Sequence, residues 1–141
     1  MESERIDCLD LCNTAFPIAM GINRSQKHVS IILDKKGKIV SIGTNTRKTH
    51  PKAQEHGYRF CELHSELDCY LRVPDSRRSE KLTLINFRFN RFGDMRMSRP
   101  CSKCMPWCKA VFERIIYTTD YGFEEVKDSQ GRKLSQTFVM V

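Results

Sequence analysis

The chain has 141 residues, 40% of which are hydrophobic, and carries a formal net charge of +7. This length suits one compact domain, and the composition excludes disordered and collagen-like proteins. No apolar run approaches the roughly 18 residues that a membrane span needs, so no membrane association through a spanning helix is expected.

The N-terminus and the cysteines indicate the compartment. Acidic residues within Met1-Glu2-Ser3-Glu4-Arg5 replace the basic start of a signal peptide, so we expect a cytoplasmic protein, or one in the host cytoplasm if the source is a virus. Seven cysteines, an odd number, argue against a disulfide scaffold there. Because Cys101 and Cys104 form a Cys-x-x-Cys pair, metal or redox chemistry is indicated instead.

The positive charge is concentrated in one part of the chain. Eleven basic and only four acidic residues lie between Arg72 and Arg114. Such a basic surface favours anionic partners such as nucleotides or polynucleotides, although a solvated basic face without any partner gives the same pattern.

The first part of the chain predicts a helix followed by two strands. Apolar residues at three- and four-residue spacing predict an amphipathic helix over 4–20, which Pro17 is expected to kink or end. Residues 29–33 and 39–42 are rich in β-branched side chains and predict strands, joined by a hairpin turn at 34–37.

The polar stretch 43–57 is too long for a tight turn and is a candidate binding loop. The remaining predicted elements are, in order, a helix near 63–71, a strand over 82–92, a short return strand over 95–97, a helix over 100–114 with a kink or irregular turn near Pro106, and short strands over 115–118 and 122–126.

This order of elements predicts an α/β fold in which helices cover one mixed sheet. We expect a single domain over 1–141. Residues 1–24 form its N-terminal helix and loop, 25–126 its catalytic core, and 127–141 a C-terminal tail.

The residues that carry chemistry lie at the predicted starts of two helices. Cys101 and Cys104 are three residues apart, so both sulfurs face one side of a first turn, where the helix N-terminus stabilises thiolates. His64 offers a nitrogen ligand at the start of the preceding helix. Three protein ligands leave one tetrahedral position of Zn2+ open, as catalytic sites require. Glu66 can hydrogen-bond a zinc-activated water without ligating the metal.

His-Ser-Glu at 64–66 together with Pro-Cys-Ser-Lys-Cys at 100–104 is the signature of zinc-dependent nucleobase deaminases. Further segments resemble the cytidine/deoxycytidylate deaminase family, particularly its short phage-type members: Gly43-Thr44-Asn45 after the second strand, Lys48-Thr49-His50-Pro51, and the run 117–122. The resemblance implies a three-layer α/β/α sandwich with a mixed sheet of about five strands. It also implies Zn2+ as cofactor and a homo-oligomer.

The resemblance also implies roles for the matched positions. Glu66 protonates the ring nitrogen and passes a proton to the departing ammonia, while zinc-activated hydroxide attacks C4 of cytosine. Asn45 hydrogen-bonds the sugar or base, and the Ser65 backbone reads the pyrimidine carbonyl. The further candidate substrate contacts are Lys27, Arg47, Lys48, His50 and Pro100, among which the lysines and the arginine can bind a phosphate.

Two positions depart from the family pattern. Ser65 stands where most relatives carry alanine, and the backbone still reads the substrate there. Asp68 stands where deoxycytidylate deaminases commonly carry asparagine, a difference that bears on the exact substrate.

Two other readings of the cysteines stay open. Cys101, Cys104 and Cys108 follow i, i+3, i+7 and, with His64, could close a structural zinc site in a non-catalytic domain. A redox Cys-x-x-Cys would need a thioredoxin-like βαβ context and would leave Glu66 unexplained.

Three functions are therefore compared. The first is deamination of a free cytosine nucleotide, deoxycytidylate to deoxyuridylate, with a small-molecule substrate. The second is deamination of a polynucleotide base, in which Arg88, Arg91, Arg96 and Arg99, interleaved with aromatic residues, would line a basic groove. The third is the structural zinc domain. We favour the first, because the chain shows no nucleic-acid-binding module.

Overall fold

The structure is a computed structural model that describes residues 6–45, 64–127 and 131. The described residues form the helices α1 (Cys8–Met20), α3 (Ser65–Leu71) and α4 (Cys104–Val111), and the short 3-10 helix η2 (Asp75–Arg77). They also form the strands β1 (Lys27–Leu33), β2 (Ile39–Thr44), β3 (Thr83–Phe89), β4 (Arg114–Thr118) and β5 (Phe123–Glu125).

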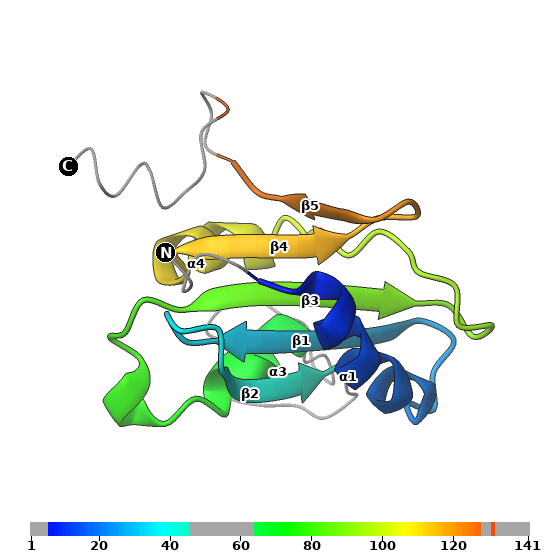
Figure 1. Cartoon of the computed structure of the whole chain (residues 1–141), viewed down its shortest axis with the longest axis horizontal. Helices are drawn as coiled ribbons and strands as arrows, with labels where there is room; N and C mark the ends of the chain where they lie inside the picture. The colour runs from blue at the N-terminus through cyan, green and yellow to red at the C-terminus, as the bar shows by residue number, and fades with distance from the viewer. Residues whose placement is uncertain (1–5, 46–63, 128–130, 132–141) are drawn as a thin grey trace.

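The strands form one mixed sheet in the order β2-β1-β3-β4-β5 (Figure 1). β3 and β4 are parallel, and the other neighbours are antiparallel. The parallel pair needs a crossover connection, which α4 supplies. The predicted mixed sheet is confirmed.

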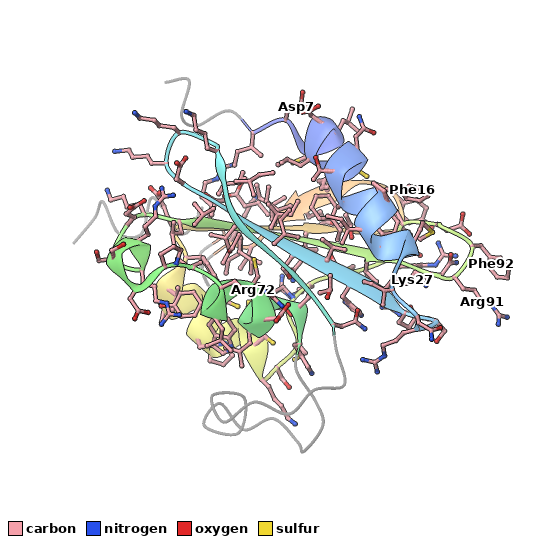
Figure 2. The ribbon with its side chains drawn as sticks, turned by 90° about the horizontal axis from the view of Figure 1, so that it is seen from below. Asp7, Phe16, Lys27, Arg72, Arg91 and Phe92 are labelled. Carbon is pink, nitrogen blue, oxygen red and sulfur yellow. The ribbon has the colours of Figure 1, made fainter. Side chains whose placement is uncertain are left out.

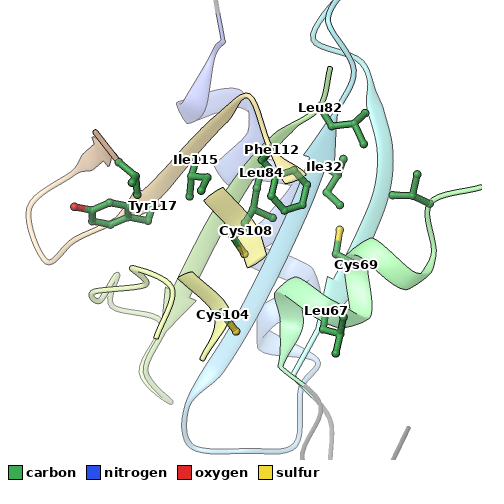
Figure 3. Close-up of a cluster of buried hydrophobic side chains, with 12 residues drawn as sticks. Ile32, Leu67, Cys69, Leu82, Leu84, Cys104, Cys108, Phe112, Ile115 and Tyr117 are labelled. Atoms are coloured by element: carbon green, nitrogen blue, oxygen red, sulfur yellow. The ribbon is translucent and has the colours of Figure 1, made fainter. Parts of the chain in front are cut away.

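Helices cover both faces of this sheet (Figure 1). On one face α1 packs on alternate residues of β1, namely Val29, Ile31 and Leu33. On the other face Ile32 and Leu84 pack against buried side chains of α3 and α4, as Figure 3 shows. Strand alternation thus supplies two apolar layers, and the expected three-layer α/β/α sandwich is confirmed.

The hairpin turn predicted at 34–37 is also confirmed. The Gly37 N–H donates to the Asp34 carbonyl, and Gly37 has a φ of 85°, which favours glycine. One carboxylate oxygen of Asp34 accepts the N–H groups of Lys36 and Lys38, both at 2.9 Å. The turn sets the register of β1 against β2.

The first helix starts later than the predicted residue 4 and ends at the predicted residue 20. It begins at Cys8, where the Asp7 carboxylate accepts the Asp10 N–H at 3.0 Å as an N-cap. It does not end at Pro17 but continues to Met20. Proline removes only its own N–H from the ladder, and the Gly21 N–H closes the last turn on the Pro17 and Ile18 carbonyls.

The last helix is shorter than its predicted range of 100–114. A turn precedes it, in which the Met105 N–H donates to the Cys101 carbonyl at 2.8 Å, and regular helix begins at Cys104. Pro106 is tolerated because N–H groups in the first turn have no helical partner. The helix stops at Val111, since Arg114 already pairs with Thr83 across β3 and β4.

The strand predicted over 82–92 is also shorter than expected. β3 ends at Phe89, and the turn that follows, with Gly93 at a φ of 86°, returns the chain through a single bridge between Phe89 and Met95. The predicted return strand is therefore one bridge long.

Candidate metal centre and its polar surroundings

The three predicted metal ligands lie together at the starts of α3 and α4. His64 is the residue before α3, Cys104 is the first residue of α4, and Cys101 lies in the turn before it. The Nδ1 atom of His64 is 3.7 Å from the Cys101 sulfur and 3.4 Å from the Cys104 sulfur. The three ligand atoms all lie within 4.8 Å of one another, so the group could hold a metal ion.

The spacing of these atoms fits zinc. With Zn–S near 2.3 Å and Zn–N near 2.05 Å, tetrahedral geometry separates a sulfur and a nitrogen ligand by about 3.6 Å. The two observed sulfur-to-nitrogen distances, 3.7 and 3.4 Å, lie on either side of that value. The donor set of one imidazole and two thiols also suits zinc, and it leaves one tetrahedral position for another ligand.

Cys108 does not belong to this group of ligands among the described residues. Its thiol is fully buried in the apolar cluster that contains Leu84 and Phe112 (Figure 3). Burial raises the pKa of the Cys108 thiol well above its usual value, and the charges of Glu66 and Cys101 raise it further. A metal ligand must be a thiolate, so this environment suits a core thiol.

Gly43 lets α3 lie directly on the sheet. A Cβ at Gly43 would lie 2.3 Å from the Cys69 nitrogen and 2.7 Å from the Ser65 carbonyl oxygen, so no other side chain fits there. The next backbone N–H along β2, that of Thr44, donates to the Asp68 carboxylate at 3.0 Å. The glycine and the aspartate together fix the start of α3, and hence His64, against β2.

Asp68 has a structural explanation in these contacts. Besides the Thr44 N–H it accepts the Arg72 Nε–H, at 3.3 Å to each carboxylate oxygen. The carboxylate therefore joins the end of β2 to α3. An aspartate at this position is explained without any contact to substrate.

Glu66, the second residue of α3, is buried in a polar network, with 7% of its surface exposed. The Asn86 amide donates to Glu66 Oε2 at 3.0 Å, and the Ser65 hydroxyl oxygen lies 3.4 Å from Glu66 Oε1. The network continues through Ser30, whose hydroxyl lies 2.8 Å from that of Ser65 and 2.7 Å from Asn86 Oδ1. The carboxylate is thus held from the sheet side.

Asn86 and Ser30 were not identified from the sequence. They are direct partners in the register of β1 and β3, and both interrupt strands that are otherwise largely apolar. Asparagine is rare in central strands, and a buried polar side chain must find partners. Two such interruptions in neighbouring strands are the signal that could have revealed them.

The residues predicted to contact the substrate do not share one environment in the structure. Asn45 follows β2; its Oδ1 accepts the His28 N–H, and its Nδ2 donates to the Gln26 carbonyl, both at 3.0 Å. Lys27 is buried, with its ammonium bound to the Ile22 carbonyl. Pro100 is buried beside Cys101. Arg47, Lys48 and His50, like most of the candidate loop 43–57, lie outside the described residues.

Comparison with known proteins supports the fold. No protein-family model and no curated protein matches the chain. Among solved structures, the chain is similar to the crystal structure of a glutamate-to-glutamine mutant cytidine deaminase from Mycobacterium tuberculosis, with 15% sequence identity and a TM-score of 0.53. The match covers 94% of this chain and 95% of that one. The described residues therefore have the fold of that cytidine deaminase structure.

The membrane expectation can be compared with the structure as well. Among the described residues, no helix has the length and apolar character needed to cross a bilayer.

Proposed function

We propose that this protein is a zinc-dependent hydrolase that converts a cytosine nucleotide, deoxycytidylate, to deoxyuridylate and ammonia. The observation that carries the proposal is the group of His64, Cys101 and Cys104, with Glu66 as the second residue of α3, the helix that His64 precedes. This arrangement lies on the cytidine deaminase fold. The three candidate ligands lie together at the starts of two helices, and this arrangement supports the proposal.

The chemistry divides between the metal and the chain. A zinc ion in such a site supplies an activated water as nucleophile at neutral pH. Glu66 takes up the proton that this water loses, delivers it to the ring nitrogen, and transfers another to the departing amino group. One water and one cytosine nucleotide are consumed, and one uracil nucleotide and one ammonia are formed. No oxidant or further reactant is needed.

The residues around Glu66 complete the proposed site. Asn45 uses one N–H and one lone pair for the backbone around β1, which leaves its second N–H available to a sugar hydroxyl. Ser65 is the first residue of α3, and its backbone is the proposed contact to the pyrimidine carbonyl. Arg47, Lys48 and His50 stay candidates for the phosphate. We no longer favour Lys27, because its ammonium already has a carbonyl partner.

A polynucleotide substrate is the second candidate, and one observation favours it. Phe92 is 75% exposed at the tip of the turn after β3, and the Arg91 guanidinium lies 5.1 Å from its ring centre (Figure 2). Such a pair can stack on an unpaired base.

The other arginines of the supposed groove make contacts within the protein. Arg88 binds the Gln26 side chain and the Met97 carbonyl, Arg96 binds the Met95 carbonyl, and Arg99 lies over the Tyr117 ring. These contacts favour a free nucleotide as substrate. They occupy guanidinium groups that would otherwise bind the phosphates of a nucleic-acid strand.

The third candidate, a structural zinc domain, requires Cys108 as fourth ligand. Among the described residues, Cys108 lies outside the group of candidate ligands and is buried in the core. This position argues against a structural zinc site. A cytoplasmic location and a homo-oligomer stay predictions.

The experiment measures ammonia release from cytidine, dCMP, dCTP, single-stranded DNA and a tRNA, with the zinc content determined on the same sample. We expect turnover of dCMP and a Glu66→Gln variant that keeps its fold and zinc but loses turnover by at least about a hundredfold. Activity confined to polynucleotide would replace the substrate assignment. Full turnover by Glu66→Gln would overturn the mechanism.

A further inference from the structure

Asn86 occupies the centre of the sheet, directly behind Glu66. It lies on β3 opposite Ser30 of β1, and beyond Ser30 the register places Gly43 of β2. Since Gly43 has no side chain, α3 lies close to this row, and the amide of Asn86 reaches Glu66 Oε2 at 3.0 Å. A strand residue thereby contacts the carboxylate to which the proposed function assigns the proton transfers.

The orientation of this amide is determined by its surroundings. Its Nδ2 is 3.0 Å from the Ser98 carbonyl oxygen, which can only accept a hydrogen bond, so the nitrogen must face that carbonyl and Glu66. Its Oδ1 accepts the Ser30 hydroxyl at 2.7 Å. Both N–H groups and the oxygen therefore have partners, and the side chain has no reason to flip.

The hydroxyl protons can be assigned in the same way. Ser30 has one hydroxyl proton, which it donates to Asn86 Oδ1, so in the bond between Ser30 and Ser65 the donor must be Ser65. The Ser65 hydroxyl thus makes its shorter contact with Ser30, at 2.8 Å, and a longer one with Glu66 Oε1, at 3.4 Å. The shorter hydrogen bond to the carboxylate is therefore that of Asn86 to Oε2, at 3.0 Å, whereas Oε1 has only the long contact with Ser65, at 3.4 Å.

We infer that Asn86 is a positioning residue for the deamination, an inference that rests on the proposed function. Its amide holds Oε2 of Glu66 so that Oε1 faces the reacting groups, and Ser30 holds the amide in turn. Asn86 touches neither the substrate nor the metal ligands in this arrangement. Its effect should therefore appear in the catalytic step and not in substrate or zinc binding.

The test compares Asn86→Leu and Asn86→Asp with Ser41→Ala. Leucine removes both N–H donors, whereas aspartate keeps the acceptor for Ser30 and replaces the donor to Glu66 with an oxygen. Ser41 is the matched control, because it is also a buried sheet residue whose side chain binds α3, through the Cys69 carbonyl at 3.0 Å, without touching Glu66.

We expect both Asn86 variants to lower kcat about 10- to 100-fold, the usual loss when the partner of a catalytic group is removed. KM should stay within about twofold, since no substrate contact is lost. Zinc content should not change, and Ser41→Ala should keep the kcat of the wild type. In a Glu66→Gln background, Asn86→Leu should cause no further fall in turnover, because the group through which it acts is already absent.

A readout independent of activity is the melting temperature of Glu66→Ala, Asn86→Leu and the double variant. Contact between the two side chains predicts that the double variant loses less than the sum of the single losses, by about 3 °C or more. Additive losses would overturn the contact. Two results with an active wild type would overturn this inference while leaving the proposed function intact. One is an unchanged kcat in Asn86→Leu, and the other is a fall in the kcat of Ser41→Ala as large as that of Asn86→Leu. If the wild type deaminates none of the substrates, the proposed function and the inference fail together.

Discussion

The sulfur of Cys104 lies 3.4 Å from Nδ1 of His64, although 40 positions separate the two residues in the chain. The sheet explains the meeting. α3 and α4 pack on the same face, and each presents its N-terminus at the same end of that face. A helix N-terminus stabilises negative charge, so thiolates and a carboxylate are favoured where the two helices start. The fold thus creates a region of positive potential where the two helices start, and this potential stabilises the thiolate form of a cysteine that binds a metal ion.

Metal removal should expose one particular thiol. We expect the purified protein to hold one zinc per chain and to lose activity on chelation. Cys101 is exposed and should be alkylated rapidly in the metal-free protein but slowly in the zinc-loaded one. Cys69 should stay unreactive in both forms, because burial raises its pKa to about 12. Mass spectrometry of the alkylated peptides measures each site, and equal labelling of Cys101 in the two forms would contradict the assignment.

Replacing two buried cysteines of α4 should separate ligand from core residue. Cys104→Ala removes a ligand and should abolish stoichiometric zinc and activity together. Cys108→Ala should keep one zinc per chain and the activity, and lose about 1 kcal/mol of unfolding free energy through the small cavity. Metal analysis after dialysis and urea unfolding supply the two numbers. Loss of zinc in Cys108→Ala would restore the structural zinc reading.

Gly43→Ala should be more harmful than an ordinary glycine replacement. The added methyl group would lie 2.3 Å from a backbone nitrogen of α3, so the helix must move. Overpacking of this kind costs about 1–3 kcal/mol or more, and here it also displaces the residue before α3, His64. We expect a lower melting temperature and weaker zinc binding.

Gly21→Ala is the matched control for that substitution. A Cβ at Gly21 meets its nearest atom, the Ile18 carbonyl oxygen, at 3.4 Å, which is ordinary contact. This variant should keep wild-type zinc affinity. If the two variants behaved alike, the close approach of β2 and α3 would not be what fixes the metal site.

The candidate metal ligands could be predicted from the sequence because they belong to local patterns. Cys101 and Cys104 are three residues apart, a spacing that places two side chains on the same side of a helical turn. His64 and Glu66 are recognised by the short His-x-Glu pattern at the start of a helix. The sheet was predictable for a similar reason, since β-branched runs and the turn at 34–37 are local signals. In the structure the three candidate ligand atoms lie within 4.8 Å of one another.

The polar network could not be predicted in the same way. Whether Asn86 meets Glu66 depends on the register of β1 against β3 and on how closely α3 lies on β2, and both are tertiary properties. The end of α4 is also set by tertiary structure, because Arg114 pairs with Thr83 of β3 and so belongs to a strand and not to the helix. Lys27 resembles a surface cation in the sequence, yet its ammonium has a carbonyl partner.

His28 should make the protein less stable in mild acid. Its side chain shares a face of the sheet with Ser30, and burial lowers its pKa from 6.5 to about 4, with the charges of Arg88, His64 and Arg24 adding to the effect. The folded state therefore favours the neutral ring. Between pH 6.5 and about 4 the unfolded chain binds a proton that the folded chain does not, so unfolding free energy falls as pH falls through this window. The loss attributable to His28 is at most about 3 kcal/mol.

The variant His28→Gln isolates this contribution, because glutamine is polar and does not titrate. The urea midpoints of wild type and variant, each in the same metal state, should converge as the pH falls from 7 to 4. Only the wild type loses stability because its unfolded chain binds a proton at position 28 that its folded chain does not. Carboxylates that titrate in this range act equally in both proteins and cancel in the difference. Because burial is the largest cause of the shift, added salt should reduce the difference only slightly. A difference that is constant over this range, or one that disappears in 1 M salt, would show that burial does not hold the ring neutral.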